Sequence, residues 1–387
     1  MARNLAAAAR SLYPRVVVSS KPKRRGKLAR LAVDRAISRL ANGLLLVVDG
    51  AATPVGNTPR DLVLRKGKLE VHRYRAPARE EIEMGTETVV VDERAFRVPI
   101  LIVPPLMVRP YIYDLRPEHS MVRLLRRFGF QVFLVDFGVP DRHDTGVRLD
   151  DYVLDWLPAA VEAVRVSAGS RELSLLGYCM GSIFSLLYTA AWRDAGVRNI
   201  VSIAAPTDFT KMGLLTTLAR VGHEQAMNLT DRIGNVPGFV SSQALKLMAP
   251  IKRFTRYADL FINLWNDEYV KGFDAMHRFT NDFIPYPQAA FKQFLQEVVV
   301  ENGLKDGLRF GDRVADLREV RSNLLVYAGR EDTIAPPRAV RPILELVGST
   351  EKDYREVPGG HIGVIAGGKA ADAVWKTAAE WLRPRSL

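Results

Sequence analysis

Cys179, the only cysteine of the 387-residue chain, stands in the five-residue pattern GYCMG at positions 177–181. An apolar run before it predicts a strand, and residues 183–192 predict a helix. A Gly-x-Cys-x-Gly turn between strand and helix is typical of a nucleophile elbow, where glycines permit a sharp bend. The helix start stabilises a thiolate, and the Met180 N–H can donate to an oxyanion. Isolated cysteines are usually small buried apolar residues, but this context indicates a nucleophile for acyl transfer.

Two further side chains complete a predicted triad. Elbow enzymes place the nucleophile, the acid and the histidine in that order along the chain. Asp332 follows the apolar run 323–329, where the carboxylate belongs, and the adjacent Glu331 is the alternative. Of six histidines, His361 alone lies in a glycine-flanked loop after the last predicted strand. We expect His361 to take the thiol proton, or to hold it in an ion pair, and Asp332 to orient His361.

A second oxyanion donor is expected in the loop after an early strand. Residues 104–109 occupy that place. A backbone N–H near Met107 or Val108 is the candidate, and we assign Val108. Backbone donors leave no side-chain signature, so the assignment depends on position in the chain.

Short apolar runs alternating with helix-like stretches indicate an α/β fold with a mostly parallel central sheet flanked by helices. The expected strands are 99–104, 132–136, 173–177, 199–205, 323–329 and 353–357. Residues 207–318 show helix-like stretches and no clear strand, which predicts a helical lid inserted into the core. We therefore expect a basic, partly helical N-terminal segment (1–75), a core (76–206 and 319–387) and the lid.

The chain has 55 Lys and Arg against 43 Asp and Glu, a formal net charge of +12, with a basic run at residues 21–27. That run is usually a solvated segment; alternatively it meets an anionic partner such as a lipid surface or a phosphate-rich substrate. No nucleic-acid motif is present, so nucleic acid is not expected. One cysteine and no stretch of signal-peptide or membrane-span length predict a cytoplasmic protein. No cofactor or metal is expected.

Together these residues resemble the polyhydroxyalkanoate synthases of the α/β-hydrolase superfamily, especially the shorter type that works with a second subunit. The resemblance covers most of the chain from about residue 50, with matching motifs at Thr58–Asp61, Arg73–Arg75, Pro99–Pro105, Tyr111–Leu115, Val135–Pro140, Leu149–Tyr152, Gly329–Pro336 and Gly359–Gly363. It implies that (R)-3-hydroxyacyl-coenzyme A acylates Cys179 and that the acyl group passes to a growing polyester. It also implies work at a granule surface, as a dimer or with an accessory subunit.

Three positions depart from the family pattern. Ser182 stands where the elbow usually has a second glycine, Val108 where asparagine is common, and Phe279 where the lid has a tryptophan. A thioesterase or depolymerase-type hydrolase would use the same triad with water as the acceptor. A non-catalytic granule-associated scaffold is the other alternative.

Overall fold

The computed structural model describes Arg35 and residues 54–75, 81–84, 87–90, 96–193, 196–247 and 259–387. The chain divides into two compact units, Met1–Ala51 with Ala258–Val270, and Ala52–Tyr257 with Lys271–Leu387. In the first unit, Arg35 is helical, and its guanidinium lies 4.4 Å from the centre of the Trp265 ring. The basic run 21–27, and the rest of the helix expected near it, lie outside the described residues.

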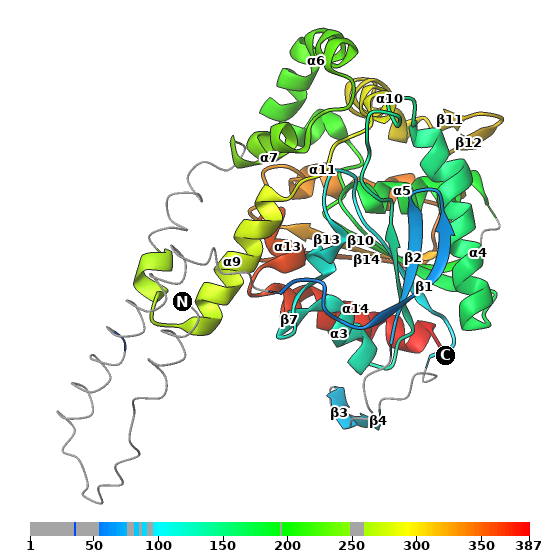
Figure 1. Ribbon diagram of the computed structural model, residues 1–387. Helices are drawn as coiled ribbons and strands as arrows, with labels where there is room; N and C mark the ends of the chain where they lie inside the picture. The colour runs from blue at the N-terminus through cyan, green and yellow to red at the C-terminus, as the bar shows by residue number, and fades with distance from the viewer. Residues whose placement is uncertain are drawn as a thin grey trace, which may run out of the picture. The chain divides into compact units, whose positions relative to one another are not determined.

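The second unit is built on an eight-stranded sheet in the order β1-β2-β8-β5-β9-β10-β13-β14 (Figure 1). The strands from β8 to β14 pair in parallel, and β1 and β2 are antiparallel. The parallel strands are β5 (Ile100–Val103), β8 (Val132–Asp136), β9 (Leu173–Tyr178), β10 (Val197–Ile203), β13 (Asn323–Gly329) and β14 (Lys352–Val357). The α/β prediction with a mostly parallel sheet is confirmed, because all six expected strands form and pair in parallel.

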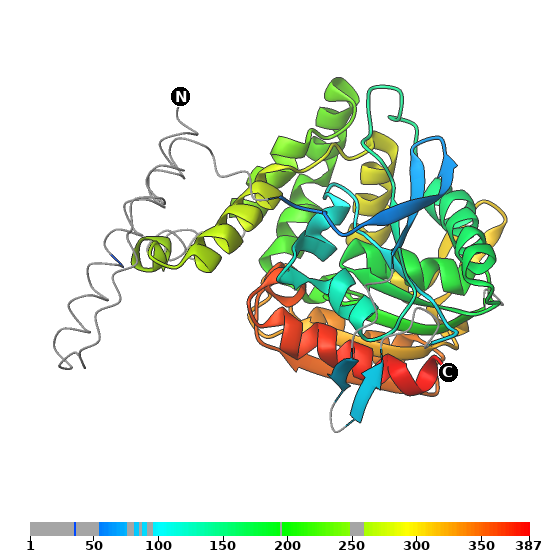
Figure 2. The same cartoon turned by 60° about the horizontal axis from the view of Figure 1, so that its bottom comes forward.

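Helices cover both faces of this sheet, which explains why its central strands β5, β9 and β10 are buried along nearly their whole length. One face carries α4 (Leu157–Ala168), which continues η2 (Asp151–Trp156), and α5 (Met180–Ala191). The other face carries α3 (Met121–Arg127) and α14 (Thr377–Leu382), and Figure 2 brings it toward the viewer. The shorter elements are η1 (Pro110–Tyr113), α11 (Pro337–Val340), α12 (Ile343–Leu346), α13 (Gly363–Ala366), η7 (Ala371–Lys376) and η8 (Arg383–Arg385).

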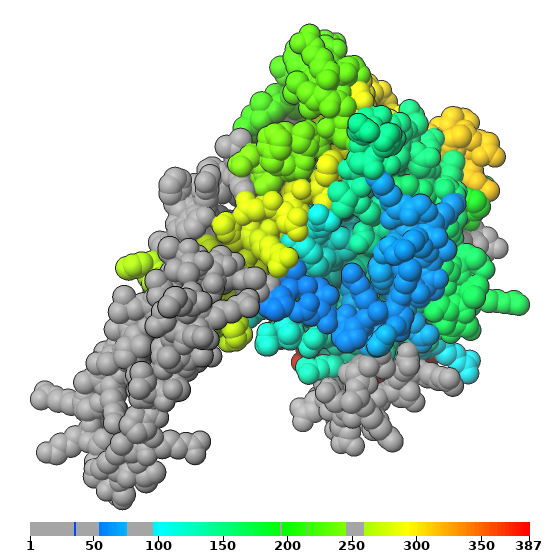
Figure 3. All heavy atoms as spheres, in the orientation of Figure 1, coloured from blue at the N-terminus to red at the C-terminus, as the bar shows by residue number. Residues whose placement is uncertain are grey.

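The sheet begins earlier in the chain than residue 76, where the sequence placed the start of the core. β1 (Arg60–Lys66) and β2 (Leu69–Tyr74) form a hairpin, and β2 pairs with β8. β2 is largely buried, whereas β1 is the exposed edge, visible in blue in Figure 3. The boundary at residue 75 is therefore wrong for residues 60–74, because a polar, charged edge hairpin lacks the continuous apolar run that marks a central strand. Two smaller hairpins are β3 (Glu81–Met84) with β4 (Glu87–Val90), and β6 (Asp114–Arg116) with β7 (His119–Ser120).

The long insertion lies between β10 and β13 and is mainly helical. It contains η3 (Phe209–Met212), α6 (Leu214–Ile233), α7 (Gly238–Leu247), α9 (Asp267–Asn281), α10 (Gln288–Gln293), η4 (Phe294–Val300), η5 (Gly303–Lys305) and η6 (Leu317–Glu319). A short hairpin of β11 (Leu308–Phe310) and β12 (Arg313–Ala315) also occurs, where the sequence indicated no strand. None of the helices in the described part of the chain has both the length and the apolar character needed to cross a membrane.

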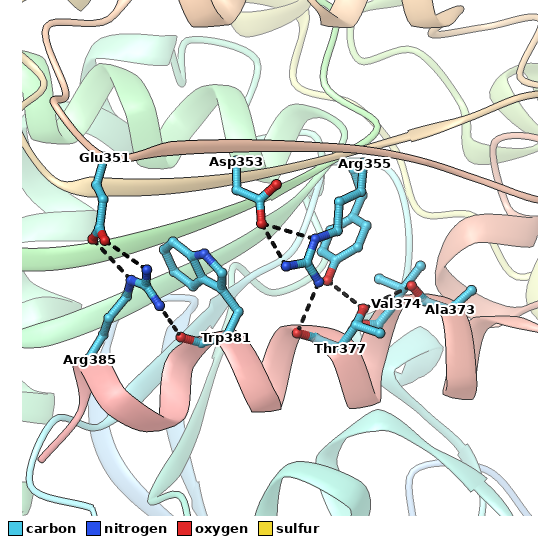
Figure 4. A network of polar contacts seen from close by, with 9 residues as sticks. Glu351, Asp353, Arg355, Ala373, Val374, Thr377, Trp381 and Arg385 are labelled. Carbon is cyan, nitrogen blue, oxygen red and sulfur yellow. Dashed lines mark hydrogen bonds and ion pairs between the residues drawn. The ribbon is translucent and has the colours of Figure 1, made fainter. Parts of the chain in front are cut away.

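β14 leads into the loop that carries His361, and polar contacts join it to the C-terminal helices (Figure 4). Arg355 pairs with Asp353 at 2.6 Å and also donates to the Thr377 carbonyl oxygen at 3.4 Å. Arg385 pairs with Glu351 at 2.8 Å. These side chains are partly exposed, and the polar contacts lie beside the buried apolar residues Trp381 and Leu382 of α14.

Candidate active site

Cys179 sits between β9 and α5 in a backbone conformation that side chains rarely adopt, with φ 52° and ψ −121°. Backbone bonds on both sides hold it there. Its N–H donates to the Ile203 carbonyl oxygen at 2.8 Å, and its own carbonyl oxygen accepts from the Ser182 N–H at 3.0 Å. Strained residues persist only where their surroundings determine them, and they concentrate at functional sites. The half-buried thiol is thus presented on a fixed turn.

The two glycines of the elbow are required by space. A Cβ atom on Gly177 would lie 2.4 Å from the Ser182 nitrogen. A Cβ atom on Gly181 would lie 2.0 Å from the Val103 carbonyl oxygen, so α5 starts in direct contact with the end of β5. The sharp bend and this close approach both depend on the missing side chains.

Ser182, a departure from the family pattern, has a structural role. Its side chain is fully buried, and its hydroxyl oxygen accepts a hydrogen bond from the Ile203 N–H at 3.1 Å. The carbonyl oxygen of the same Ile203 accepts from the Cys179 N–H. The serine therefore joins α5 to β10 beside the nucleophile, and its polar group is paired as burial demands.

His361 and Asp332 come together as the sequence predicted. His361 Nδ1 lies 2.8 Å from Asp332 Oδ2, and Asp332 Oδ1 accepts from the Ile334 and Ala335 N–H groups, each at 2.8 Å. Burial disfavours the carboxylate, but His361 and the two N–H groups outweigh it and hold the pKa of Asp332 below its usual value. Asp332 therefore stays ionised and fixed against the imidazole.

The charge state of His361 links it to Cys179. Burial disfavours the imidazolium, yet the nearby Cys179 and Asp332 raise the pKa of His361 to about 10. His361 is therefore protonated at neutral pH when the sulfur carries negative charge. The three predicted residues meet at the carboxyl ends of β9, β13 and β14.

Glu331, the alternative acid, does something else. Its carboxylate accepts from the Gly359 N–H, and its own N–H donates to the Gly359 carbonyl oxygen at 3.2 Å. These two bonds join Glu331 to Gly359, which lies two residues before His361, and they stabilise the loop that carries the imidazole. The carboxylate that faces the imidazole belongs to Asp332.

Three buried tyrosines around Cys179 were missed by the sequence analysis. The Tyr178 hydroxyl donates to the His361 carbonyl oxygen at 3.2 Å, and the two rings lie 5.1 Å apart. The Tyr113 hydroxyl donates to the Val103 carbonyl oxygen at 3.3 Å, and the Tyr286 hydroxyl donates to Met180 Sδ at 3.4 Å. Burial, reinforced by Cys179, raises the pKa of both Tyr113 and Tyr178 well above the usual value, so both stay neutral donors. In the sequence, the position of Tyr178 next to Cys179 was the one feature that could have indicated a tyrosine at the site.

The two proposed oxyanion donors lie on either side of the contact between α5 and the end of β5. Met180 is the first residue of α5, where a backbone N–H has no partner one turn back in the helix. Val108 is buried in the turn after β5, next to Met107, which has a φ of 61°. The sequence prediction for Val108 concerns a backbone group, and its role stays a prediction.

A small recess adjoins this turn. Its walls come from the turn itself (Leu106, Val108), from Phe137 after β8, from Tyr152, and from Pro285 of the insertion. Most of the wall is apolar, and the recess is small, about 10 Å³, which is room for about one water molecule. In the part of the chain that the structure describes, no cluster of three or more His, Cys, Asp or Glu side chains is placed to hold a metal ion.

Comparison with known sequences places this site in context. Residues 113–367 match a family described as the alpha/beta hydrolase fold. The chain is 36% identical over 337 residues to the poly(3-hydroxyalkanoate) polymerase subunit PhaC of Haloferax mediterranei, covering 86% of this chain and 65% of that protein. It is 34% identical over 335 residues to the Haloarcula marismortui protein of the same name (86% and 69%). It is 31% identical over 350 residues to the Allochromatium vinosum protein of that name (90% and 94%). The chain thus spans just under two thirds of the first of these relatives and nearly all of the third.

Solved structures support the fold alone. A putative lipase from Sulfolobus solfataricus matches with a TM-score of 0.52 at 16% identity, over 84% of this chain and 99% of that one. The putative non-heme bromoperoxidase BpoC from Mycobacterium tuberculosis matches with a TM-score of 0.50 at 13% identity, over 81% and 98%. Function must be argued from the site, because one fold hosts many activities.

Proposed function

Because the chain belongs to the poly(3-hydroxyalkanoate) polymerase subunit PhaC family, we propose that it transfers (R)-3-hydroxyacyl groups from coenzyme A thioesters to a growing polyester through Cys179. One observation carries the proposal: the only cysteine stands on a strained elbow beside a histidine whose pKa it raises, and Asp332 holds that histidine at 2.8 Å. This is the arrangement that nucleophilic acyl transfer requires.

In the first half-reaction, the Cys179 thiolate attacks the carbonyl carbon of the thioester and forms a tetrahedral oxyanion. The N–H groups of Met180 and Val108 stabilise the oxyanion. When the carbon–sulfur bond to coenzyme A breaks, protonated His361 gives its proton to the departing thiolate. Free coenzyme A and an acyl-Cys179 thioester result, and His361 is left neutral.

In the second half-reaction, neutral His361 accepts the proton of the incoming hydroxyl group as its oxygen attacks the acyl-Cys179 carbonyl. The ester bond forms and the bond to Cys179 breaks, so the thiolate and the imidazolium are restored together. Asp332 stabilises the imidazolium in both half-reactions and keeps the ring oriented. Repetition lengthens the polyester by one unit at a time.

The chemistry of sulfur favours this assignment. Exchange of an acyl group between two thiols is nearly balanced in free energy, so acylation of Cys179 does not trap the acyl group on the enzyme. The substrate is polyanionic, which suits a chain of formal net charge +12.

We place the protein in the cytoplasm, at the surface of polyester granules, with an accessory synthase subunit or as a homodimer. The relatives are named as subunits, which supports a partner chain in those proteins. We assign the insertion between β10 and β13 to a lid that governs access of substrate and exclusion of water. Nucleic acid is not among the proposed partners.

The decisive experiment supplies (R)-3-hydroxybutyryl-coenzyme A to the full chain, alone and with the accessory subunit. The polymerase proposal predicts insoluble polyester and release of coenzyme A. A thioesterase or depolymerase-type hydrolase would instead yield free hydroxy acid, since it uses the same triad with water as the acceptor. Formation of free acid alone would replace the proposal with that second function.

The nucleophile assignment has its own test. Cys179→Ala should abolish the acyl adduct seen by intact-mass spectrometry, and Cys179→Ser should keep the fold and lose most of the rate. Loss of a triad nucleophile costs roughly a factor of 10⁶ in rate. An unchanged adduct on Cys179→Ala would refute the assignment, and unchanged biological function would favour a non-catalytic granule scaffold.

A further inference from the structure

The insertion holds the turn that carries the proposed second oxyanion donor. The Ile284 N–H donates to the Met107 carbonyl oxygen at 3.0 Å. All peptide bonds of the described chain are trans, so the N–H of Val108 points away from the carbonyl oxygen of Met107 in the same peptide plane. Fixing that carbonyl toward Ile284 therefore directs the Val108 N–H to the opposite side, away from the insertion backbone.

Asp282, two residues before Ile284, strengthens this connection. One carboxylate oxygen accepts from Arg109 Nε at 3.3 Å, and the other accepts from the Tyr111 hydroxyl at 3.0 Å. The side chains of Arg109 and Asp282 are each 36% exposed, so water has access to this ion pair. Burial, with the nearby charge of Asp282, raises the pKa of Tyr111 and keeps its hydroxyl a donor.

Contacts before and after Asp282 in the chain also join the insertion to the core. The buried Phe279 packs edge-on against Tyr111, with ring centres 6.0 Å apart. Beyond Ile284, the Tyr286 hydroxyl meets Met180 Sδ at the other proposed oxyanion donor. Residues 279–286 thus contact both the turn after β5 and the start of α5, which together frame the carbonyl oxygen of a bound acyl group.

We propose that Asp282 is a positioning residue: it locks the insertion onto the turn after β5, so that the Val108 N–H is aimed for catalysis only while residues 279–286 are seated. The inference rests on the proposed function, and it adds that the lid and the oxyanion site are one coupled unit. Asp282 touches neither the sulfur nor the imidazole. Its loss should therefore slow acyl transfer without changing the reactivity of the thiolate.

The test compares Asp282→Ala with Glu172→Ala in the full chain. Glu172 forms a similar partly exposed ion pair with Arg198, at 3.2 Å, but at the amino-terminal ends of β9 and β10, away from the site. Two rates are measured: acylation of Cys179 by a chromogenic aryl thioester, and alkylation of Cys179 by iodoacetamide, which forms no oxyanion. Asp282→Ala should acylate about 10-fold more slowly, a fraction of the 10²- to 10³-fold cost of deleting an oxyanion donor. Its alkylation rate should equal that of the wild type, and Glu172→Ala should change neither rate.

Tyr111→Phe is the graded second variant, because it keeps the ring on Phe279 and loses only one bond to Asp282. It should reduce kcat by a smaller factor than Asp282→Ala and leave KM unchanged. Wild-type acylation in Asp282→Ala would overturn the proposal, and so would an equal loss in both the acylation and the alkylation rates. Failure of (R)-3-hydroxybutyryl-coenzyme A to react while the aryl thioester acylates Cys179 would instead count against the proposed substrate alone.

Discussion

The nucleophile elbow carries Cys179, and the turn after β5 contacts the start of α5, the helix that follows the elbow, but different kinds of contact hold the two in place. Buried backbone bonds and two sterically required glycines fix the elbow, where α5 meets β9, β10 and the end of β5. The turn depends on one backbone bond and on a partly exposed carboxylate, Asp282, that is 171 residues from Tyr111 in the chain. Attack by sulfur and one proposed oxyanion donor, the Met180 N–H, thus belong to the buried core, whereas we propose that the second donor, the Val108 N–H, is held by contacts that water can reach.

Among the substitutions that test the buried core of the site, we expect the largest effect from a change of Asp332. Asp332→Asn keeps the shape of the side chain but removes its charge and favours the wrong imidazole tautomer. We expect acyl transfer to fall by about 10⁴-fold, as for the equivalent change in a serine triad. The pKa of His361, raised to about 10 in the wild type, should fall, because one of the charges that raise it is lost. NMR titration of the imidazole measures this, and Glu172→Gln, at the amino-terminal end of β9 and away from the site, is the control.

The sign of the pH dependence follows from the same shift. The pKa of His361 is raised from 6.5, so protonated His361 contributes stability that is fully present below pH 6.5 and is lost as the pH rises through about 10. The pKa of Asp332 is lowered, so its carboxylate contributes stability at pH values above its usual pKa. That contribution is lost as the pH falls through the lowered pKa. Chemical denaturation from pH 6 to pH 10 should show this decline in the wild type and a smaller one in His361→Gln. An equal decline in both proteins would contradict the assignment.

Two glycine substitutions sharpen the contrast between core and insertion. Gly181→Ala should destabilise the protein by about 1–3 kcal/mol, because its Cβ would overlap the Val103 carbonyl oxygen. Gly222→Ala, inside α6 with no atom within 4 Å of the new Cβ, should stabilise it by about 0.5–1 kcal/mol. Urea denaturation measures both. Shifts of the same sign would contradict the contrast between a tightly packed elbow and an open position in α6 of the insertion.

The smallest effect is expected at Tyr178. Tyr178→Phe removes the bond to the His361 carbonyl oxygen but keeps the ring contact. A hydrogen bond of this kind contributes about 1 kcal/mol, so we expect a loss of roughly threefold to fivefold in kcat at most. The pH–rate profile should shift as the imidazole loosens, while Tyr113→Phe, which leaves the His361 loop untouched, should not shift it.

The parts of the fold that sequence predicted share one physical property: their signals are local. A short, mainly apolar run marks each central parallel strand, and β8 and β13 begin and end at the predicted residues. The elbow is marked by glycines whose spacing reflects steric contact within a few residues. His361 and Asp332 were predicted because a parallel sheet gathers the ends of its strands at one edge.

The parts that sequence missed depend on partners distant in the chain. β2 is recognisable as a strand of the sheet only once it pairs with β8, more than 50 residues later. Tyr178 meets the His361 loop, and Tyr286 meets Met180, across separations of 183 and 106 residues. In the sequence, Ser182 was only a departure from the family pattern. Its structural role follows from the hydrogen bond that its hydroxyl oxygen accepts from the Ile203 N–H. Hydroxyl and carboxylate groups carry no periodic signal that would announce such contacts.

The ion pairs in β14 and just before its first residue have a consequence for solution conditions. Arg355 with Asp353, and Arg385 with Glu351, are partly open to water, so dissolved electrolyte screens them. The elbow has no such dependence, because its bonds are buried. Rising ionic strength should therefore loosen the strand ahead of His361 before it disturbs the elbow, and a free energy of unfolding that falls with added salt would measure this.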